Sequence, residues 1–179
     1  MSDEIKEIET VEEITILQPS KEGGAIKFDP KDISVLEILL TFTELQGLRV
    51  GWFKSLDNYF KSYTENKISV EEYRSKNEVL KEEQKKFTHH CLALINNLKD
   101  EASYKRPDLG DKLENILKLE KLLLETTAQL QTATVLDATE DRDYSEDKTR
   151  LNAKVEELRK EISEAMFELH EDMADLYEE

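Results

Sequence analysis

The sequence has few of the residues that force a chain to turn or cross-link. Among 179 residues there are only 5 glycines, 3 prolines, one tryptophan and one cysteine, Cys91. A single cysteine excludes an internal disulfide and fits a reducing intracellular compartment. Scarce glycine and proline leave long stretches in which nothing interrupts a helix.

Segments that direct a protein to a membrane or out of the cell are also missing. No apolar run approaches the ~20 residues that a helix needs to cross a bilayer. The first residues, Met-Ser-Asp-Glu, have neither the basic flank nor the apolar core of a signal peptide. We therefore expect an intracellular protein of the nucleus or the cytoplasm, without membrane contact.

The motifs of common catalytic and cofactor sites are absent. The sequence contains no P-loop, GxSxG elbow or dinucleotide-binding glycine pattern. His89, His90 and Cys91 are consecutive, and neighbouring helical residues diverge by about 100°, so one helix cannot turn all three toward one ion. We expect no catalytic residue, no metal and no cofactor, and hence no enzyme.

What the chain has in abundance is charge, most of it negative. There are 41 acidic and 25 basic residues, a net charge of −16, and residues 138–179 alone carry 15 acidic and 6 basic residues. Duplex DNA binding needs a basic face that displaces counterions from phosphates, so direct binding is not expected. A basic face would have to come from Lys81, Lys85, Lys86, His89 and His90, but Glu78, Glu82 and Glu83 lie among them. The acidic ends instead favour protein partners.

Hydrophobic residues recur at helical spacing in four segments. Asp29 and Pro30 predict the cap and first residue of a helix that reaches about Tyr63. Ser69 and Glu72 predict a capping box at the start of a second helix. A third follows Pro107–Asp108 and fades near residue 137, and a fourth begins at about Ser145. Their predicted seams follow a heptad-like alternation, as in Tyr73, Asn77, Leu80, Gln84, Phe87, Cys91, Leu94 and Leu98 of the second helix.

These segments predict an all-α protein, an antiparallel bundle of three or four long helices with coiled-coil-like seams. Residues 1–28 are expected to form an acidic, disordered tail, residues 29–137 the helical core domain, and residues 138–179 an acidic linker with an amphipathic helix. Homo-oligomers could form through the heptad seams.

Charged residues interrupt two of the apolar seams. Arg49 falls between Leu45 and Trp52 in the first helix, and Glu120 occupies a similar position in the third. An unpaired buried charge is costly, so the two could meet and fix the register of the helices. Alternatively, Arg49 belongs to a contact site for a partner, where Gly47 and Gly51 would let another backbone approach closely.

Several short motifs resemble those of a known family. They are Leu45-Gln46-x-x-Arg49-Val50, the aromatic residues Phe53, Tyr59, Phe60 and Tyr63, then Tyr73, Phe87 and Ile95, then Arg106-Pro107-Asp108-Leu109, Leu119-Glu120-x-x-x-Leu124 and Thr127-Ala128-x-Leu130-Gln131. From Leu36 to Gln131 the chain resembles the small "required for excision, type B" DNA repair family.

The resemblance implies a non-enzymatic accessory protein of DNA excision repair that binds other proteins, repair factors among them. It assigns family-signature or partner-contact roles to Leu45, Gln46, Arg49, Glu120, Thr127 and Gln131. The helical pattern alone is equally typical of a coiled-coil scaffolding subunit in a cytoskeletal, trafficking or chromatin complex, and that alternative stays open. A direct nucleic-acid binder is the third hypothesis.

Overall fold

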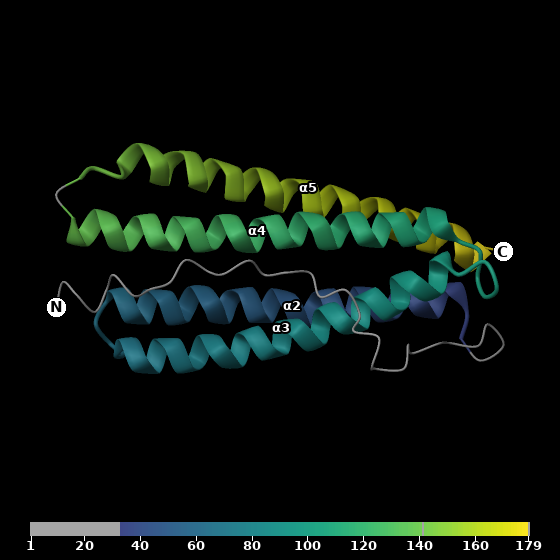
Figure 1. The fold of residues 1–179 in the computed structure, drawn as a ribbon. Coiled ribbons are helices and arrows are strands. Elements are labelled where there is room, and N and C mark those ends of the chain that lie inside the picture. Colours follow the sequence, from purple (N-terminus) through teal and green to yellow (C-terminus); the bar gives the residue numbers. More distant parts are fainter. Residues whose placement is uncertain (1–32, 141, 179) are drawn as a thin grey trace. The chain divides into compact units, whose positions relative to one another are not determined.

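Four long helices make up the described part of the chain. The computed structural model describes residues 33–140 and 142–178, and 88% of these are helical. The helices are α2 (Val35–Thr64), α3 (Val70–Lys99), α4 (Pro107–Thr139) and α5 (Ser145–Glu178) (Figure 1). No strand occurs within those residues. The prediction of an all-α protein with long antiparallel helices is confirmed, whereas the predicted acidic tail lies outside the described residues.

The first residue of α2 differs from the prediction. The helix begins after Ser34, whose Oγ accepts a hydrogen bond from the backbone N–H of Glu37 at 3.2 Å. The Glu37 carboxylate in turn accepts from the backbone N–H of Ser34 at 2.7 Å, which completes a capping box. The prediction that Asp29 caps this helix is therefore wrong, since Ser34 and Glu37 carry the spacing that binds both orphan amides.

The cap of α3 follows the prediction in one half only. The Ser69 Oγ accepts from the backbone N–H of Glu72 at 3.2 Å, as expected. Glu72 does not complete the box and instead forms an ion pair with Lys76 at 3.4 Å. The neighbouring carboxylate of Glu71 has its pKa lowered chiefly by a hydrogen bond with Ser69.

An antiparallel hairpin of α2 and α3 forms the first half of the described chain, and the two helices lie side by side (Figure 1). Midway along it, Trp52 Nε1 donates a hydrogen bond to the backbone oxygen of Leu80. Near the turn, the rings of Tyr63 and Tyr73 stack with their centroids 4.9 Å apart. Aromatic side chains therefore connect α2 and α3 both at the middle of the hairpin and near its turn.

The structure divides into two compact units. The four-helix unit comprises residues 33–115 and 167–178, and the hairpin unit comprises residues 116–166. Both α4 and α5 contribute to each unit, so these units follow spatial compactness. The predicted sequence boundaries after residues 28 and 137 stay predictions.

The four-helix unit has a core to which all four helices contribute. Its most deeply buried side chains are those of Ile38, Leu39, Phe42, Cys91, Leu98, Leu109, Leu113 and Leu169. Polar contacts join the helix ends around it. Lys99 of α3 forms ion pairs with Asp111 and Glu114 of α4, each at 2.6 Å, and Lys112 of α4 pairs with Asp172 of α5. Four helix segments thus share one apolar centre with charged residues at its rim.

The hairpin unit consists of the rest of α4 and the first part of α5. Its residues Ile116 and Leu158 are fully buried. Its turn is held by Asp137, which accepts from the Lys148 ammonium at 2.7 Å and from the backbone N–H of Tyr144 at 3.0 Å. These bonds lower the pKa of the Asp137 carboxyl. One carboxylate therefore anchors both the turn and the start of α5.

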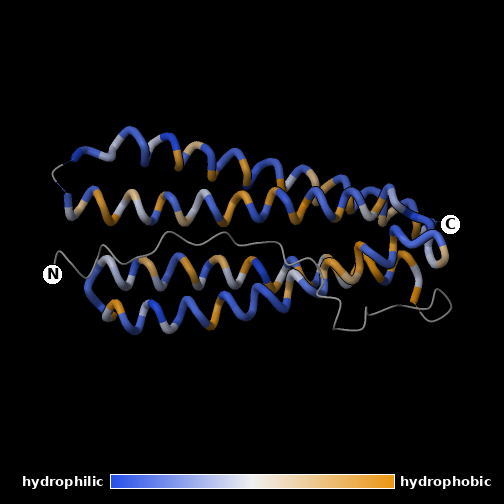
Figure 2. The backbone as a smooth tube through the Cα atoms, in the orientation of Figure 1, coloured by the Kyte–Doolittle hydropathy of each residue, from blue (hydrophilic) through white to orange (hydrophobic). Residues whose placement is uncertain are grey.

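The predicted seams agree with burial. In Figure 2 hydrophobic residues recur along α4, whereas α5 is largely hydrophilic. Along α4, the predicted residues are buried from Leu109 to Thr127, and Leu130 is half-buried. In α5, Leu151, Val155, Leu158, Leu169 and Met173 are buried. The heptad-like alternation identified the core-facing side of each helix.

Candidate functional site

A polar and aromatic cluster surrounds Arg49 in the α2–α3 hairpin. The Arg49 guanidinium carbon lies 4.9 Å from the centroid of the Phe53 ring and 5.7 Å from that of Phe87 on α3. One of its nitrogens donates to the side-chain oxygen of Gln46 at 3.3 Å. Rings above a cation and an amide beside it stabilise a charge that water cannot fully solvate. Arg49 is therefore held within the hairpin by its own neighbours.

Burial changes the ionisation of two groups in this cluster. Desolvation lowers the pKa of Arg49 to about 9, so the guanidinium still carries its charge at neutral pH. Desolvation also raises the pKa of the Cys91 thiol to about 12, although the Arg49 charge opposes this. A thiol that stays protonated and buried is a poor nucleophile. Cys91 acts as a small apolar core residue.

Three of the six predicted signature residues lie on α2. Gln46 is buried, Leu45 and Arg49 are half-buried, and the hydrogen bond between Gln46 and Arg49 shows that two of them act together. Their positions within one turn of the helix explain the contact. These residues fit a packing role in the four-helix unit.

The other three signature residues lie on α4. Glu120 and Thr127 are buried, with Glu120 only 3% exposed, and Gln131 is half-buried. Spacings of seven and four residues place them on one side of the helix. Because Glu120 belongs to the hairpin unit and Arg49 to the four-helix unit, their pairing stays a prediction from sequence.

Threonine hydroxyls on α4 are satisfied by the helix itself. Thr127 Oγ1 donates to the backbone oxygen of Leu123 at 2.8 Å, and the same bond four residues back is made by Thr126, Thr132 and Thr134. Such back-bonding allows a hydroxyl to be buried at little cost and leaves its methyl group for packing. Thr127 is engaged in this way, which fits a structural role.

The described residues offer no metal-binding constellation. His89 and His90 are exposed on α3 while Cys91 is buried, as their divergence on a helix requires. No group of three His, Cys, Asp or Glu side chains within residues 33–140 and 142–178 could hold an ion. None of the four helices is long and apolar enough to cross a membrane.

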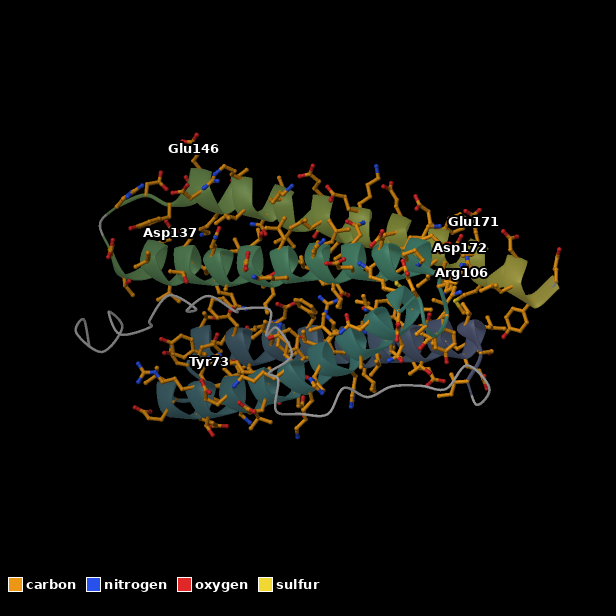
Figure 3. The ribbon with its side chains drawn as sticks, turned by 45° about the vertical axis from the view of Figure 1, so that its right-hand side comes forward. Tyr73, Arg106, Asp137, Glu146, Glu171 and Asp172 are labelled. Carbon is orange, nitrogen blue, oxygen red and sulfur yellow. The ribbon has the colours of Figure 1, made fainter. Side chains whose placement is uncertain are left out.

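The second half of α5 carries a surface that the sequence analysis identified only as acidic. We call residues 161–178 the acidic end of α5, because they contain seven carboxylates and no lysine or arginine. Two large aromatic side chains are exposed there, Phe167 at 64% and Tyr177 at 66%. Figure 3 shows Glu171 on the outer side of α5, whereas Asp172 lies toward α4, where it pairs with Lys112.

Carboxylates at this position are unfavourable for the helix itself. The C-terminal end of a helix carries partial negative charge, and acidic residues three or four apart repel one another. The last turn of α5 contains no basic residue that would offset this. The arrangement is chemically suited to bind a positively charged partner. The absence of Lys and Arg after Lys160 could have been read from the sequence, but the exposure of Phe167 could not.

A comparison with protein families identifies a relationship for the central part of the chain. Residues 37–134 match the model of a family described as DNA repair REX1-B. This range is close to the Leu36–Gln131 segment in which the signature motifs lie. No curated protein and no solved structure matches the chain.

Proposed function

This chain belongs to the DNA repair REX1-B family, and from that membership we propose that it is a non-enzymatic accessory protein of DNA excision repair that acts through protein–protein contacts. We further propose that this family is the "required for excision, type B" family that the signature motifs resemble. The observation that carries the repair role is the match over residues 37–134, which includes all six signature residues.

A non-enzymatic role is supported by how these residues are engaged. The Arg49 guanidinium is stacked on two rings and bound to Gln46, and the Thr127 hydroxyl is bonded to its own helix. A catalytic group needs a free reactive atom within reach of a substrate. Side chains that are engaged in this manner instead support a scaffold whose partners bind elsewhere on the surface.

The acidic end of α5 is the surface that we assign to the partner. Seven carboxylates without a local lysine or arginine would attract a basic segment, and exposed Phe167 supplies apolar contact area at the edge of the charged face. The expected partner is therefore a protein with a Lys- and Arg-rich segment that includes an apolar side chain. Such contacts form fast and weaken with salt.

The test replaces the chain in cells by a variant with four neutralised side chains, Glu164→Gln, Glu168→Gln, Glu171→Gln and Asp175→Asn. We expect slower removal of bulky DNA lesions and loss of partner capture at native salt. The variant should remain folded, because removing negative charge near a helix C-terminus stabilises the helix.

The matched control neutralises four exposed carboxylates outside the acidic end of α5 and outside the ion pairs of α3, by replacing Glu71, Glu83, Glu101 and Glu140 with glutamine. This control changes the net charge equally and should leave repair intact. Normal lesion removal in cells that lack the chain altogether would contradict the repair role and favour the alternative of a scaffolding subunit. Equal effects of the two variants would contradict the assignment to α5.

A further inference from the structure

Two glycines lie in the middle of α2, and neither backbone conformation nor close packing within the described residues requires a glycine there. Gly47 and Gly51 are exposed and one helical turn apart, on the side of α2 opposite buried Phe42 and Leu56. No described side chain or neighbouring backbone lies within 4 Å of a Cβ placed at either position, and neither residue has a positive φ. Each glycine weakens the helix relative to alanine. Our expectation that another backbone approaches here is not met within the described chain.

Large apolar side chains flank the glycines. Leu48 is 73% exposed and Val50 is 56% exposed, one on each side of the glycine row. Residues 47, 48, 50 and 51 thus form a shallow apolar surface, with no side chains along its middle and one apolar side chain at each edge. In a chain of which 37% is charged, such a surface is unusual and suited to receive another helix.

Charges at the two ends of this surface identify the helix that fits it. Glu44 precedes Gly47 by three residues, and Lys54 follows Gly51 by three residues, on the same side of α2. Both side chains are exposed, and neither takes part in an ion pair among the described residues. The order along this side is acidic, glycine, glycine, basic. Arg49 is level with the centre of this row but lies on the opposite side of α2, against Phe87 of α3. A second α2 in the opposite direction presents the complementary order.

We propose that the glycine face, formed by Glu44, Gly47, Leu48, Val50, Gly51 and Lys54, is a self-association surface for a second copy of this chain. The two α2 helices run antiparallel and cross at the level of Arg49 along the helix, so that Gly47 of one copy is level with Gly51 of the other. The same two-fold symmetry brings each Glu44 level with Lys54 of the second copy. Leu48 and Val50 close the two sides of the contact. Without side chains at the crossing, the helix axes can approach to about 8 Å, the low end of the normal range.

The contact is isologous, which distinguishes it from an interface with an unrelated protein. Each contact occurs twice, because Gly47 of one copy meets Gly51 of the other and the reverse, so one substitution changes the interface at two places. A single helix pair buries less than the roughly 1,200 Å² of a standard interface. The dimer is therefore weak and depends on concentration, and it is separate from the acidic end of α5.

The first experiment measures the mass of the full chain by sedimentation over a range of concentrations. We expect the mass to rise toward that of a dimer for the natural chain. The double variant Gly47→Leu and Gly51→Leu should weaken association by at least about tenfold, because its side chains block the crossing. Open space at both positions and the better helix propensity of leucine keep the monomer folded, which thermal unfolding verifies. The matched control, Ser75→Leu with Asn96→Leu on exposed positions of α3, should leave association unchanged.

The second experiment reverses the charges. Glu44→Lys alone and Lys54→Glu alone should each weaken the dimer, since like charges become level at both ends. An equimolar mixture of the two single variants should restore association, as should one chain that carries both changes. No such rescue is expected for a different partner protein. A natural chain that stays monomeric at hundreds of micromolar, or a dimer that persists in the leucine variant, would overturn the proposal.

Discussion

The indole Nε1 of Trp52 donates a hydrogen bond to the backbone oxygen of Leu80, with 2.6 Å between the two atoms. It joins the middle of α2 to the middle of α3. A side chain that both packs and donates is well suited to fix how one helix lies along another.

Replacing Trp52 by phenylalanine should destabilise the protein by about 1 kcal/mol for the lost hydrogen bond, with a further loss from reduced packing. Urea unfolding followed by far-ultraviolet circular dichroism measures this change. Tyr177→Phe, which alters an exposed ring on α5, serves as the control and should leave the midpoint unchanged. Equal midpoints for natural chain and Trp52→Phe would show that the bond contributes nothing.

Cys91 should make stability fall in alkaline solution. The thiol of Cys91 has a pKa of about 8.5 in an unfolded chain, but burial raises this pKa to about 12 in the folded protein. Between these values Cys91 binds fewer protons in the unfolded state, so its contribution lowers the free energy of unfolding by up to about 1.4 kcal/mol per pH unit. Arg49, whose pKa is lowered to about 9 in the fold, contributes with the opposite sign above that pH. The slope should therefore be more negative in the natural chain than in Cys91→Ala, which retains Arg49. Identical slopes in urea unfolding from pH 8 to 10 would contradict the raised pKa.

Removal of the Ser34 hydroxyl tests the corrected start of α2. Ser34→Ala should cost about 1 kcal/mol, the usual contribution of an N-cap. The cost should shrink in acid: hydrogen bonds from Ser34 lower the pKa of Glu37, so the capping box persists above that pKa and is lost below it. Ser75→Ala, in the exposed middle of α3, is the control and should not destabilise. An effect no larger than that of the control would place the cap elsewhere.

Arg49 and Glu120 remain a predicted pair, and a double-mutant cycle can decide it. Since Glu120 is 3% exposed and Arg49 is desolvated, each needs compensation for its buried charge. If they pair, Arg49→Met or Glu120→Met alone should destabilise by about 3–5 kcal/mol, and both together should recover much of that loss. Additive effects would exclude the pair. If Arg49→Met leaves stability unchanged but abolishes partner capture, Arg49 belongs to a contact site.

Direct binding to DNA should be negligible. Lys81 and Lys85, which the sequence offered as part of a basic face, form ion pairs with Glu78 and Glu82 at 2.7 Å and 2.6 Å. At physiological salt we expect a dissociation constant of ~10⁻⁴ M or weaker for duplex DNA in a gel-shift assay. Binding in the sub-micromolar range would contradict a role through protein contacts and revive direct lesion recognition.

Much of the fold could be predicted because helices leave a periodic record in sequence. Alternating apolar residues marked the buried side of α3 and α4, and Pro107 and Ser145 marked helix starts within a residue. The start of α2 was predicted five residues too early, because Asp29 and Ser34 both have side chains that can cap a helix and the hydrogen bonds of Ser34 appear only in the structure. The sequence pattern indicates that a helix starts within a few residues, and the hydrogen-bond geometry identifies the residue that caps it.

The surfaces were harder to predict than the core. Periodicity showed Arg49 in a seam, but the rings of Phe53 and Phe87 around it come from two helices whose alignment the sequence does not specify. The exposure of the Phe167 side chain and the open space beside Gly47 depend on which other parts of the chain pack nearby. Such features follow from tertiary packing, which leaves no periodic trace.

The positions of the only tryptophan and the only cysteine limit what simple spectroscopy can observe. Trp52 and Cys91 both belong to the four-helix unit, whereas residues 116–166 contain neither. Indole fluorescence and thiol labelling would therefore both report on the four-helix unit, and neither would report on the hairpin unit. Loss of structure confined to the hairpin unit would leave both signals unchanged, and a two-state analysis would overlook it. A tryptophan at Leu122, which is 42% exposed on α4, would make that unit visible and separate the two unfolding events.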